Sequence, residues 1–84
     1  MNWFTYIAQA KTGRYYTGIT TDAAARLEKH NTGKGSRFAI QQGPFTMKYI
    51  SLPFASKSEA RKREAQIKRW TREKKEKLIS GEWK

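Results

Sequence analysis

The pattern of apolar and polar residues begins with two short runs that are typical of β-strands. Trp3 to Gln9 and Tyr15 to Thr20 are rich in aromatic and β-branched residues, which favour the pleated, half-buried surface of a sheet. Residues 11–14, Lys-Thr-Gly-Arg, separate the two runs and are typical of a turn. The pattern therefore predicts an antiparallel hairpin at the start of the chain.

A short helix is predicted after the hairpin. Thr20-Thr21-Asp22 offers an N-cap and an acidic first turn to a segment that runs through Asn31. Gly33 then stands where a helix C-terminus favours glycine. Residues 32–43 are rich in glycine and lack a sustained period, so we expect a loop there, with Lys34 and Arg37 exposed on it.

A third strand is predicted over residues 45–52. Phe45, Met47 and Tyr49 alternate with the residues between them, and this period of two places the three side chains on one face of a strand. Beyond Pro53, Ser56 and Glu59 have the spacing of a capping box at the start of a helix.

The C-terminal part predicts a helix, a short break and a second helix, because Thr71 can cap a new helix and Gly81 follows its end. The expected order is thus β-β-α-β-α-α. We expect an α+β fold in which helices flank a small, three-stranded, mainly antiparallel sheet. At 84 residues the chain fits a single domain, 1–84, with a frayed tail over about 80–84.

Charge adds a partner to this picture. The 18 Lys and Arg against 7 Asp and Glu give a net charge of +11, which favours a polyanion, with nucleic acid as the first candidate. Zero cysteines and one histidine exclude disulfides, thiolate zinc sites and His-cluster metal sites. The N-terminus does not have the pattern of a secretory signal, and no apolar run is long enough for a membrane span, so we expect a cytoplasmic protein without a membrane partner.

One carboxylate occupies an unusual position. Glu64 shares a helix side with Ala60 and Ile67. Its simplest role is an ion pair with Lys68, four residues on. Because a buried carboxylate needs a compensating cation, Glu64 is also a candidate ligand for a hard ion such as Mg²⁺.

Four further residues are candidates for the same site. Arg26 and His30 lie one turn apart on one side of the first helix. Tyr6 and Tyr16 lie on the two strands of the hairpin. Each of the four, taken alone, is most simply a core or surface residue. A site requires that they converge with Glu64.

The order and spacing of Tyr6, Tyr16-Thr17-Gly18, Arg26, His30 and Glu64 resemble the GIY-YIG nuclease superfamily. The resemblance is to its short stand-alone bacterial branch, which is similar to the nuclease domain of structure-specific junction endonucleases. It covers the chain from about Trp3 to Ile79. In the first motif, Phe4-Thr5-Tyr6, only the tyrosine is kept.

The resemblance implies a metal-dependent DNA endonuclease that hydrolyses phosphodiester bonds. Selectivity for branched DNA structures is left open. Glu64 would hold one divalent cation, Mg²⁺ or Mn²⁺, and the planar fork of Arg26 suits the phosphate oxygens. Tyr6, Tyr16 and His30 all remain candidates for activating the water. Gly18 is expected to let substrate or a helix approach the strand closely, or to be an ordinary strand-end glycine.

Convergence of the tyrosines depends on the hairpin loop. A two-residue turn at Thr12-Gly13 would place Tyr6 and Tyr16 on opposite faces, whereas a three-residue loop, Thr12-Gly13-Arg14, places them on one face. An active site therefore predicts the odd loop or a bulge, with a glycine available for positive φ.

Basic residues suited to contacting a phosphate backbone outside the cleft are Lys34, Arg37, Lys57, Arg61, Lys62, Lys68, Arg69, Lys74 and Lys75. The alternative to an enzyme is a non-catalytic module that binds DNA or RNA through these basic helices. DNA is the favoured partner and a monomer is expected. A partner protein that supplies specificity is left open.

Overall fold

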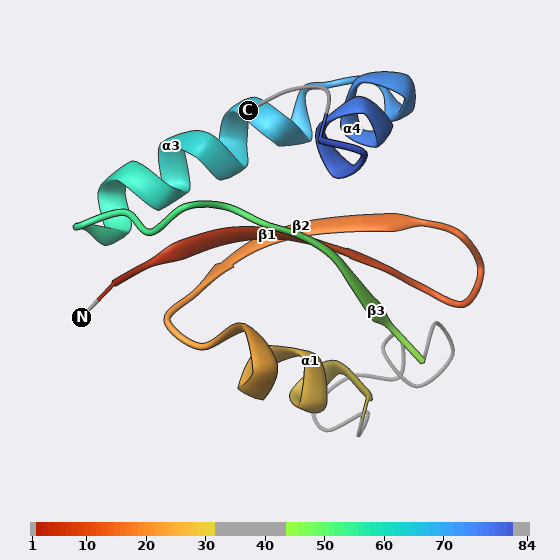
Figure 1. The fold of residues 1–84 in the computed structure, drawn as a ribbon, viewed down its shortest axis with the longest axis horizontal. Helices are drawn as coiled ribbons and strands as arrows, with labels where there is room; N and C mark the ends of the chain where they lie inside the picture. The colour runs from red at the N-terminus through yellow and green to blue at the C-terminus, as the bar shows by residue number, and fades with distance from the viewer. Residues whose placement is uncertain (1, 32–43, 82–84) are drawn as a thin grey trace.

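The computed structural model describes residues 2–31 and 44–81. The elements follow one another as β1 (Phe4–Gln9), β2 (Tyr15–Thr20), α1 (Ala23–Asn31), β3 (Thr46–Ile50), α3 (Lys57–Lys68) and α4 (Arg72–Ile79), labelled as in Figure 1. This order confirms the predicted β-β-α-β-α-α succession. β2 has the predicted bounds, whereas β1 and β3 are shorter than predicted, and Trp3 forms an isolated bridge with Phe54.

The strands form one antiparallel sheet in the order β2-β1-β3, which leaves β2 and β3 as its edges. Helices α3 and α4 cover one face of the sheet and α1 lies against the other (Figure 1). The expected α+β fold is therefore confirmed. None of the helices in residues 2–31 and 44–81 is long and apolar enough to cross a membrane.

The hairpin loop spans three residues, Lys11 to Gly13. The amide of Ala10 donates to the carbonyl of Arg14 at 2.8 Å, and Gly13 has a φ of 95°, which glycine adopts without strain. Tyr6 pairs with Gly18, and Ala8 pairs with Tyr16. The predicted odd loop is confirmed, one residue earlier in the chain than expected, and it places Tyr6 and Tyr16 on the same face of the sheet.

A bulge in the pairing of β1 with β3 changes the predicted faces of the third strand. Ile7 pairs with Tyr49, and the next residue, Ala8, pairs with Met47, so Lys48 is the extra residue. Met47 consequently packs on the face covered by α1, and Tyr49 packs on the other. The prediction of a shared face was wrong for Tyr49, because strict alternation takes no account of a bulge.

Alternate residues of β1 supply two separate hydrophobic cores. Tyr6, Ala8 and Ala10 join Phe45 on the α1 face. Ile7, on the other face, is fully buried against Ile67 of α3 and Leu78 of α4. The central strand is thus buried on both sides, as expected for a sheet between two helical layers.

Side-chain caps fix where the helices begin. The Ser56 hydroxyl accepts from the Glu59 amide at 3.2 Å, and the Thr71 hydroxyl accepts from the Lys74 amide at 3.3 Å. The predicted starts of α3 and α4 are therefore confirmed. Asp22 caps α1 by accepting from the Ala25 amide at 3.1 Å. It stands before the helix, so the first turn of α1 has no acidic residue.

Thr5 connects β1 to α3. Its side chain is fully buried, and its hydroxyl donates to the Ala60 carbonyl at 2.9 Å across 55 residues of sequence. Its own amide donates to the Ser51 hydroxyl at 2.9 Å. These bonds fix α3 along the central strand, and Glu64 lies one helical turn after Ala60.

Gly18 accommodates the side chain of Tyr6. A Cβ atom at Gly18 would lie 2.6 Å from the Tyr6 hydroxyl oxygen and 2.8 Å from Cζ. The phenol therefore lies across β2 at its residue without a side chain. Gly18 lies inside the strand, so the expectation of a strand-end glycine was wrong, and the atoms nearest to an added Cβ belong to Tyr6. The expected close approach of substrate or a helix stays a prediction.

Gly18→Ala is expected to lower the free energy of unfolding by about 1–3 kcal/mol, because the added methyl overpacks against Tyr6. At an unconstrained strand position the same change would stabilise the protein by about 0.4–1 kcal/mol, so the sign is diagnostic. Chemical denaturation of Gly18→Ala, Tyr6→Leu and the double variant measures the coupling. In the Tyr6→Leu background the alanine should no longer destabilise; an equal loss in both backgrounds would contradict the contact.

Candidate active site

The two tyrosines lie side by side on the α1 face of the hairpin. The Tyr6 side chain is 5% exposed, and Tyr16 is half-buried. The Tyr16 ring meets Phe45 edge-on, with ring centroids 5.5 Å apart. Because β1 and β2 are held in register by the three-residue loop, both phenols are fixed relative to the edge of the sheet.

Arg26 approaches this face from α1. Leu27, its neighbour, packs against the core that contains Tyr6, and Arg26 itself is half-buried. Its positive charge acts on the Tyr6 phenol and lowers the pKa of that group. The packing of Leu27 therefore fixes the part of α1 that carries Arg26 against this face of the sheet.

Glu64 approaches from the opposite side of the sheet, on α3. Its neighbours on the helix, Ala60 and Ile67, are fully buried, whereas the Glu64 side chain is 22% exposed. The carboxylate forms an ion pair with Lys68 at 3.5 Å, so the predicted pair is confirmed. Its negative charge also raises the pKa of Tyr6.

Tyr6 is the point at which these groups meet. Its pKa lies above the ordinary value of 10.0, first because the phenol is buried, while Arg26 lowers the pKa and Glu64 raises it. The pKa of Tyr6 thus responds to Arg26 of α1 and to Glu64 of α3, and the phenol lies over Gly18 of β2, which has no side chain.

Three other predicted residues fall wholly or partly outside the described region. His30 belongs to α1, one turn after Arg26, but its side chain lies outside the described part of the chain. Lys34 and Arg37 lie outside the described residues altogether.

A metal ion at this site would depend on Glu64. Among the described residues, no group of three or more His, Cys, Asp or Glu side chains could hold an ion. A single, partly exposed carboxylate fits a hard cation that retains several water ligands, as Mg²⁺ does. The donor set is therefore compatible with an ion that takes its remaining ligands from water and substrate.

The basic residues of α3 fall on two sides of the helix. Lys57, Arg61 and Lys68 share a stripe with Glu64, at successive spacings of four, three and four residues. Lys62 and Arg69 lie on a different side of the helix. Two of the lysines lie over tryptophan rings: Nζ of Lys57 is 5.3 Å from the Trp3 ring centroid, and Nζ of Lys74 is 4.9 Å from the Trp70 ring centroid.

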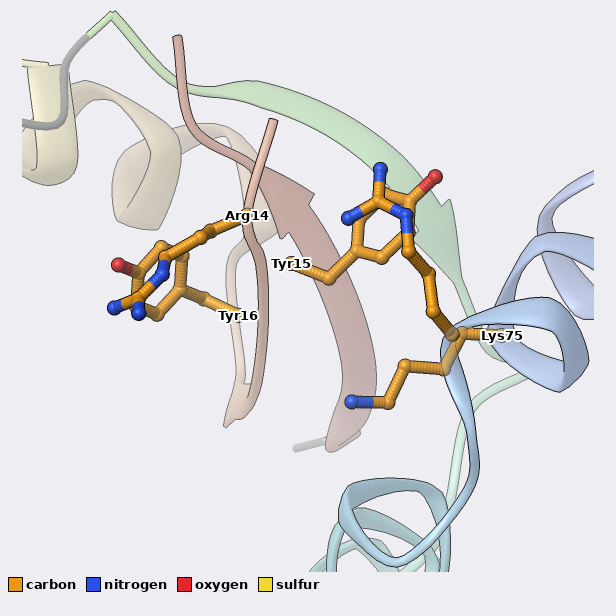
Figure 2. Close-up of a pocket in the computed structure, with 5 residues that line it drawn as sticks. Arg14, Tyr15, Tyr16 and Lys75 are labelled. Carbon is orange, nitrogen blue, oxygen red and sulfur yellow. The ribbon is translucent and has the colours of Figure 1, made fainter. Parts of the chain in front are cut away.

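Two arginines that the sequence analysis did not single out, Arg14 and Arg72, lie near Tyr15 and Tyr16 at the start of β2. A hollow at the start of β2 is lined by Arg14, Tyr15, Tyr16, Arg72 and Lys75 (Figure 2). Arg14 could have been found from its position two residues before Tyr16, which places both on one side of an extended chain. Arg72 belongs to α4, and nothing in the sequence pattern indicates that this helix packs beside the hairpin.

Comparisons with known proteins agree with this geometry. The profile of the GIY-YIG catalytic domain matches residues 2–77. The UPF0213 protein BH0048 of Halalkalibacterium halodurans is 42% identical over 80 residues, which cover 95% of this chain and 84% of that protein. The names of such relatives state no activity.

Solved structures show the same fold. The solution NMR structure of the UPF0213 protein BH0048 from Bacillus halodurans matches with a TM-score of 0.59 and 42% identity, over 95% of this chain and 84% of that one. The NMR structure of protein EF2693 from E. faecalis matches with a TM-score of 0.63 and 31% identity, over 96% of this chain and 85% of that one.

The matched domain implies a nucleic-acid substrate, and GIY-YIG nucleases generally use a divalent metal ion. The domain match covers most of the chain, and the relatives extend over nearly the same length. The chain therefore belongs to the GIY-YIG nuclease family, in its short bacterial branch.

Proposed function

We propose that this protein is a metal-dependent DNA endonuclease that hydrolyses phosphodiester bonds at the edge of β2. The proposed catalytic residues are Tyr6, Tyr16, Arg26, His30 and Glu64. One observation carries the proposal: the profile of the GIY-YIG catalytic domain matches residues 2–77, and within that match the buried Tyr6 phenol lies against Gly18 of β2.

The charges suit the requirements of phosphodiester hydrolysis, which needs an activated water, compensation of the charge that grows on the phosphate, and protonation of the leaving oxygen. Arg26 presents a planar fork of donors that can bind two phosphate oxygens and stabilise the transition state. Glu64 would hold Mg²⁺ or Mn²⁺, which supplies Lewis-acid chemistry to the scissile phosphate when bound.

The electrostatic surroundings of Tyr6 favour one of its possible roles. Because burial raises the pKa of its phenol above 10.0, Tyr6 keeps its proton at neutral pH. A protonated phenol can donate a hydrogen bond to a phosphate oxygen or a proton to the leaving oxygen. We therefore assign Tyr6 as donor, which leaves Tyr16 and His30 as candidates for activating the water.

Glu64→Gln is expected to lower the rate of DNA cleavage by about 100- to 1000-fold, the size of effect seen when a charge-stabilising group is removed, while DNA binding persists. The assay is nicking of plasmid, branched and duplex DNA with Mg²⁺ or Mn²⁺, and the binding measurement is fluorescence anisotropy in EDTA. Glu28→Gln is the matched control, because Glu28 is exposed and two residues from Arg26, on another side of α1.

Each outcome of this comparison is informative. Equal cleavage by the wild type and Glu64→Gln would assign the activity to a contaminant and contradict the proposal. Tight binding by the wild type without cleavage of any substrate with either ion would favour the non-catalytic module instead.

The phenol of Tyr6 is expected to titrate above pH 10, visible as phenolate absorbance that Tyr6→Phe removes. Glu64→Gln should lower this pKa and Arg26→Gln should raise it, because each variant removes one of the two opposing charges. A Tyr6 titration that neither variant shifts would show that the charges are remote from the phenol.

The same group contributes to stability with a defined sign. Since the folded-state pKa is the higher one, the neutral phenol's contribution is fully present below about pH 10, the unfolded value. It is lost as the pH rises through the folded-state pKa. Denaturation of the wild type against Tyr6→Phe should therefore show a difference that changes only above about pH 10.

DNA affinity is expected to fall steeply with salt, because basic side chains displace counterions from the backbone. The stripe on α3 makes a finer prediction: Arg61→Gln, on the Glu64 side, should reduce the slope of log affinity against log salt by about 0.9. Lys62→Gln, on another side of the helix, should reduce it less. Equal effects of the two variants in anisotropy titrations would contradict a defined track along α3.

A further inference from the structure

A second basic site lies beside the candidate active site, at the start of β2. The hollow has a volume of about 270 Å³ and is lined by Arg14, Tyr15, Tyr16, Arg72 and Lys75. Figure 2 shows Arg14 and Tyr16 on one side of the hairpin, and Tyr15 and Lys75 on the other. The hollow therefore extends over both sides of the hairpin at the start of β2. Tyr16 belongs to this hollow and to the candidate active site.

Arg72 is held in a fixed orientation within this hollow. Its guanidinium carbon lies 4.4 Å from the Tyr15 ring centroid, and its Nη1 donates to the Gly13 carbonyl at 2.9 Å across 59 residues. Its Nε lies 3.6 Å from Oε1 of Glu76. The side chain is nevertheless 56% exposed, so donors of the guanidinium remain accessible to a ligand.

Charge in the hollow is positive. Arg14, Arg72 and Lys75 all line it, and none of its lining residues is acidic. Glu76, which pairs with Arg72, is not among the lining residues, and instead borders a separate hollow with Glu73, Lys77 and Ser80. Three cations around one small opening, one of them already oriented, favour an anion with several oxygen acceptors.

We propose that this hollow binds a non-scissile phosphate of the DNA strand that is cut, and that it sets the position of the strand along the edge of β2. The proposal rests on the proposed function, since it assumes a DNA strand at that edge. Arg14 precedes Gly18 by four residues, which is about 13 Å along a strand. The bound phosphate would therefore lie a few nucleotides from the scissile one on the same strand.

The phosphate scan that tests this proposal measures binding and does not depend on cleavage. Single methylphosphonate linkages, which remove the charge of one phosphate, are placed in turn along one strand of a DNA substrate, and affinity is measured by anisotropy in EDTA. In the wild type, the substitution opposite the hollow should weaken binding roughly tenfold. In Arg72→Gln and Lys75→Gln the same substitution should have little further effect, while the other positions remain sensitive.

Position along the strand gives the second readout. The phosphate that becomes insensitive in Arg72→Gln should lie a few nucleotides from the one that becomes insensitive in Arg26→Gln, always on the same side of it. Lys77→Gln removes a cation from another side of α4 and should leave the whole scan unchanged. The second site is excluded if Arg72→Gln weakens binding without changing the sensitivity of any one phosphate to substitution. It is also excluded if Arg72→Gln and Arg26→Gln make the same phosphate insensitive.

Failure of the two proposals is distinguishable. If DNA is not cut, or is cut equally by Glu64→Gln, the endonuclease proposal fails, while a phosphate silenced only by Arg72→Gln and Lys75→Gln still supports the hollow. If cleavage requires Glu64 but no such phosphate exists, the hollow fails and the endonuclease stands.

Discussion

Two consecutive residues of the central strand, Thr5 and Tyr6, position the groups of the candidate active site. Thr5 and Tyr6 point to opposite faces of β1, as neighbours in a strand must. The Thr5 hydroxyl bonds the Ala60 carbonyl and fixes α3 on one face, and the Tyr6 phenol lies across Gly18 on the other. Glu64 follows Ala60 by one helical turn, so the strand that positions the phenol also positions the carboxylate. In addition to burial, the charge of Glu64 raises the pKa of the phenol from the other face of the sheet.

This arrangement gives a function to a strand edge that proteins ordinarily have to protect. An unpaired edge can pair with another chain, and natural sheets discourage this with charged residues and bulges. Here β2 is an edge of the sheet, and the hollow at its start is lined by Arg14, Arg72 and Lys75. The same cations that would repel a second basic chain of net charge +11 attract a polyanion. Under the proposed function, one set of side chains would both protect the edge and recognise a phosphate backbone.

Local chemistry explains which features the sequence could predict. Helix starts follow from caps at Ser56 and Thr71, which act within three residues, and the shared face of the tyrosines follows from the length of the hairpin loop. The bulge at Lys48 could not be predicted, because it arises where β3 pairs with β1 and appears in no local pattern. The contact of Arg72 with Gly13 likewise exists only once α4 has packed beside the hairpin. The sequence thus predicts the elements and several candidate residues, whereas the long-range contacts that complete the second basic site require the fold.

The balance of charge around Glu64 constrains how the proposed site must work. The carboxylate shares a helical stripe with three basic residues and is paired with one of them, Lys68. In the free protein this cation competes with any metal ion for Glu64, and the surplus of positive charge disfavours a second cation nearby. A DNA strand along β2 would weaken both the competition from Lys68 and the repulsion by the surplus positive charge. Its phosphates would compensate Lys68 and Arg26 and supply further oxygen ligands to the metal ion. Under the proposed function, DNA binding and metal binding must therefore strengthen one another, because linkage between two ligands is reciprocal.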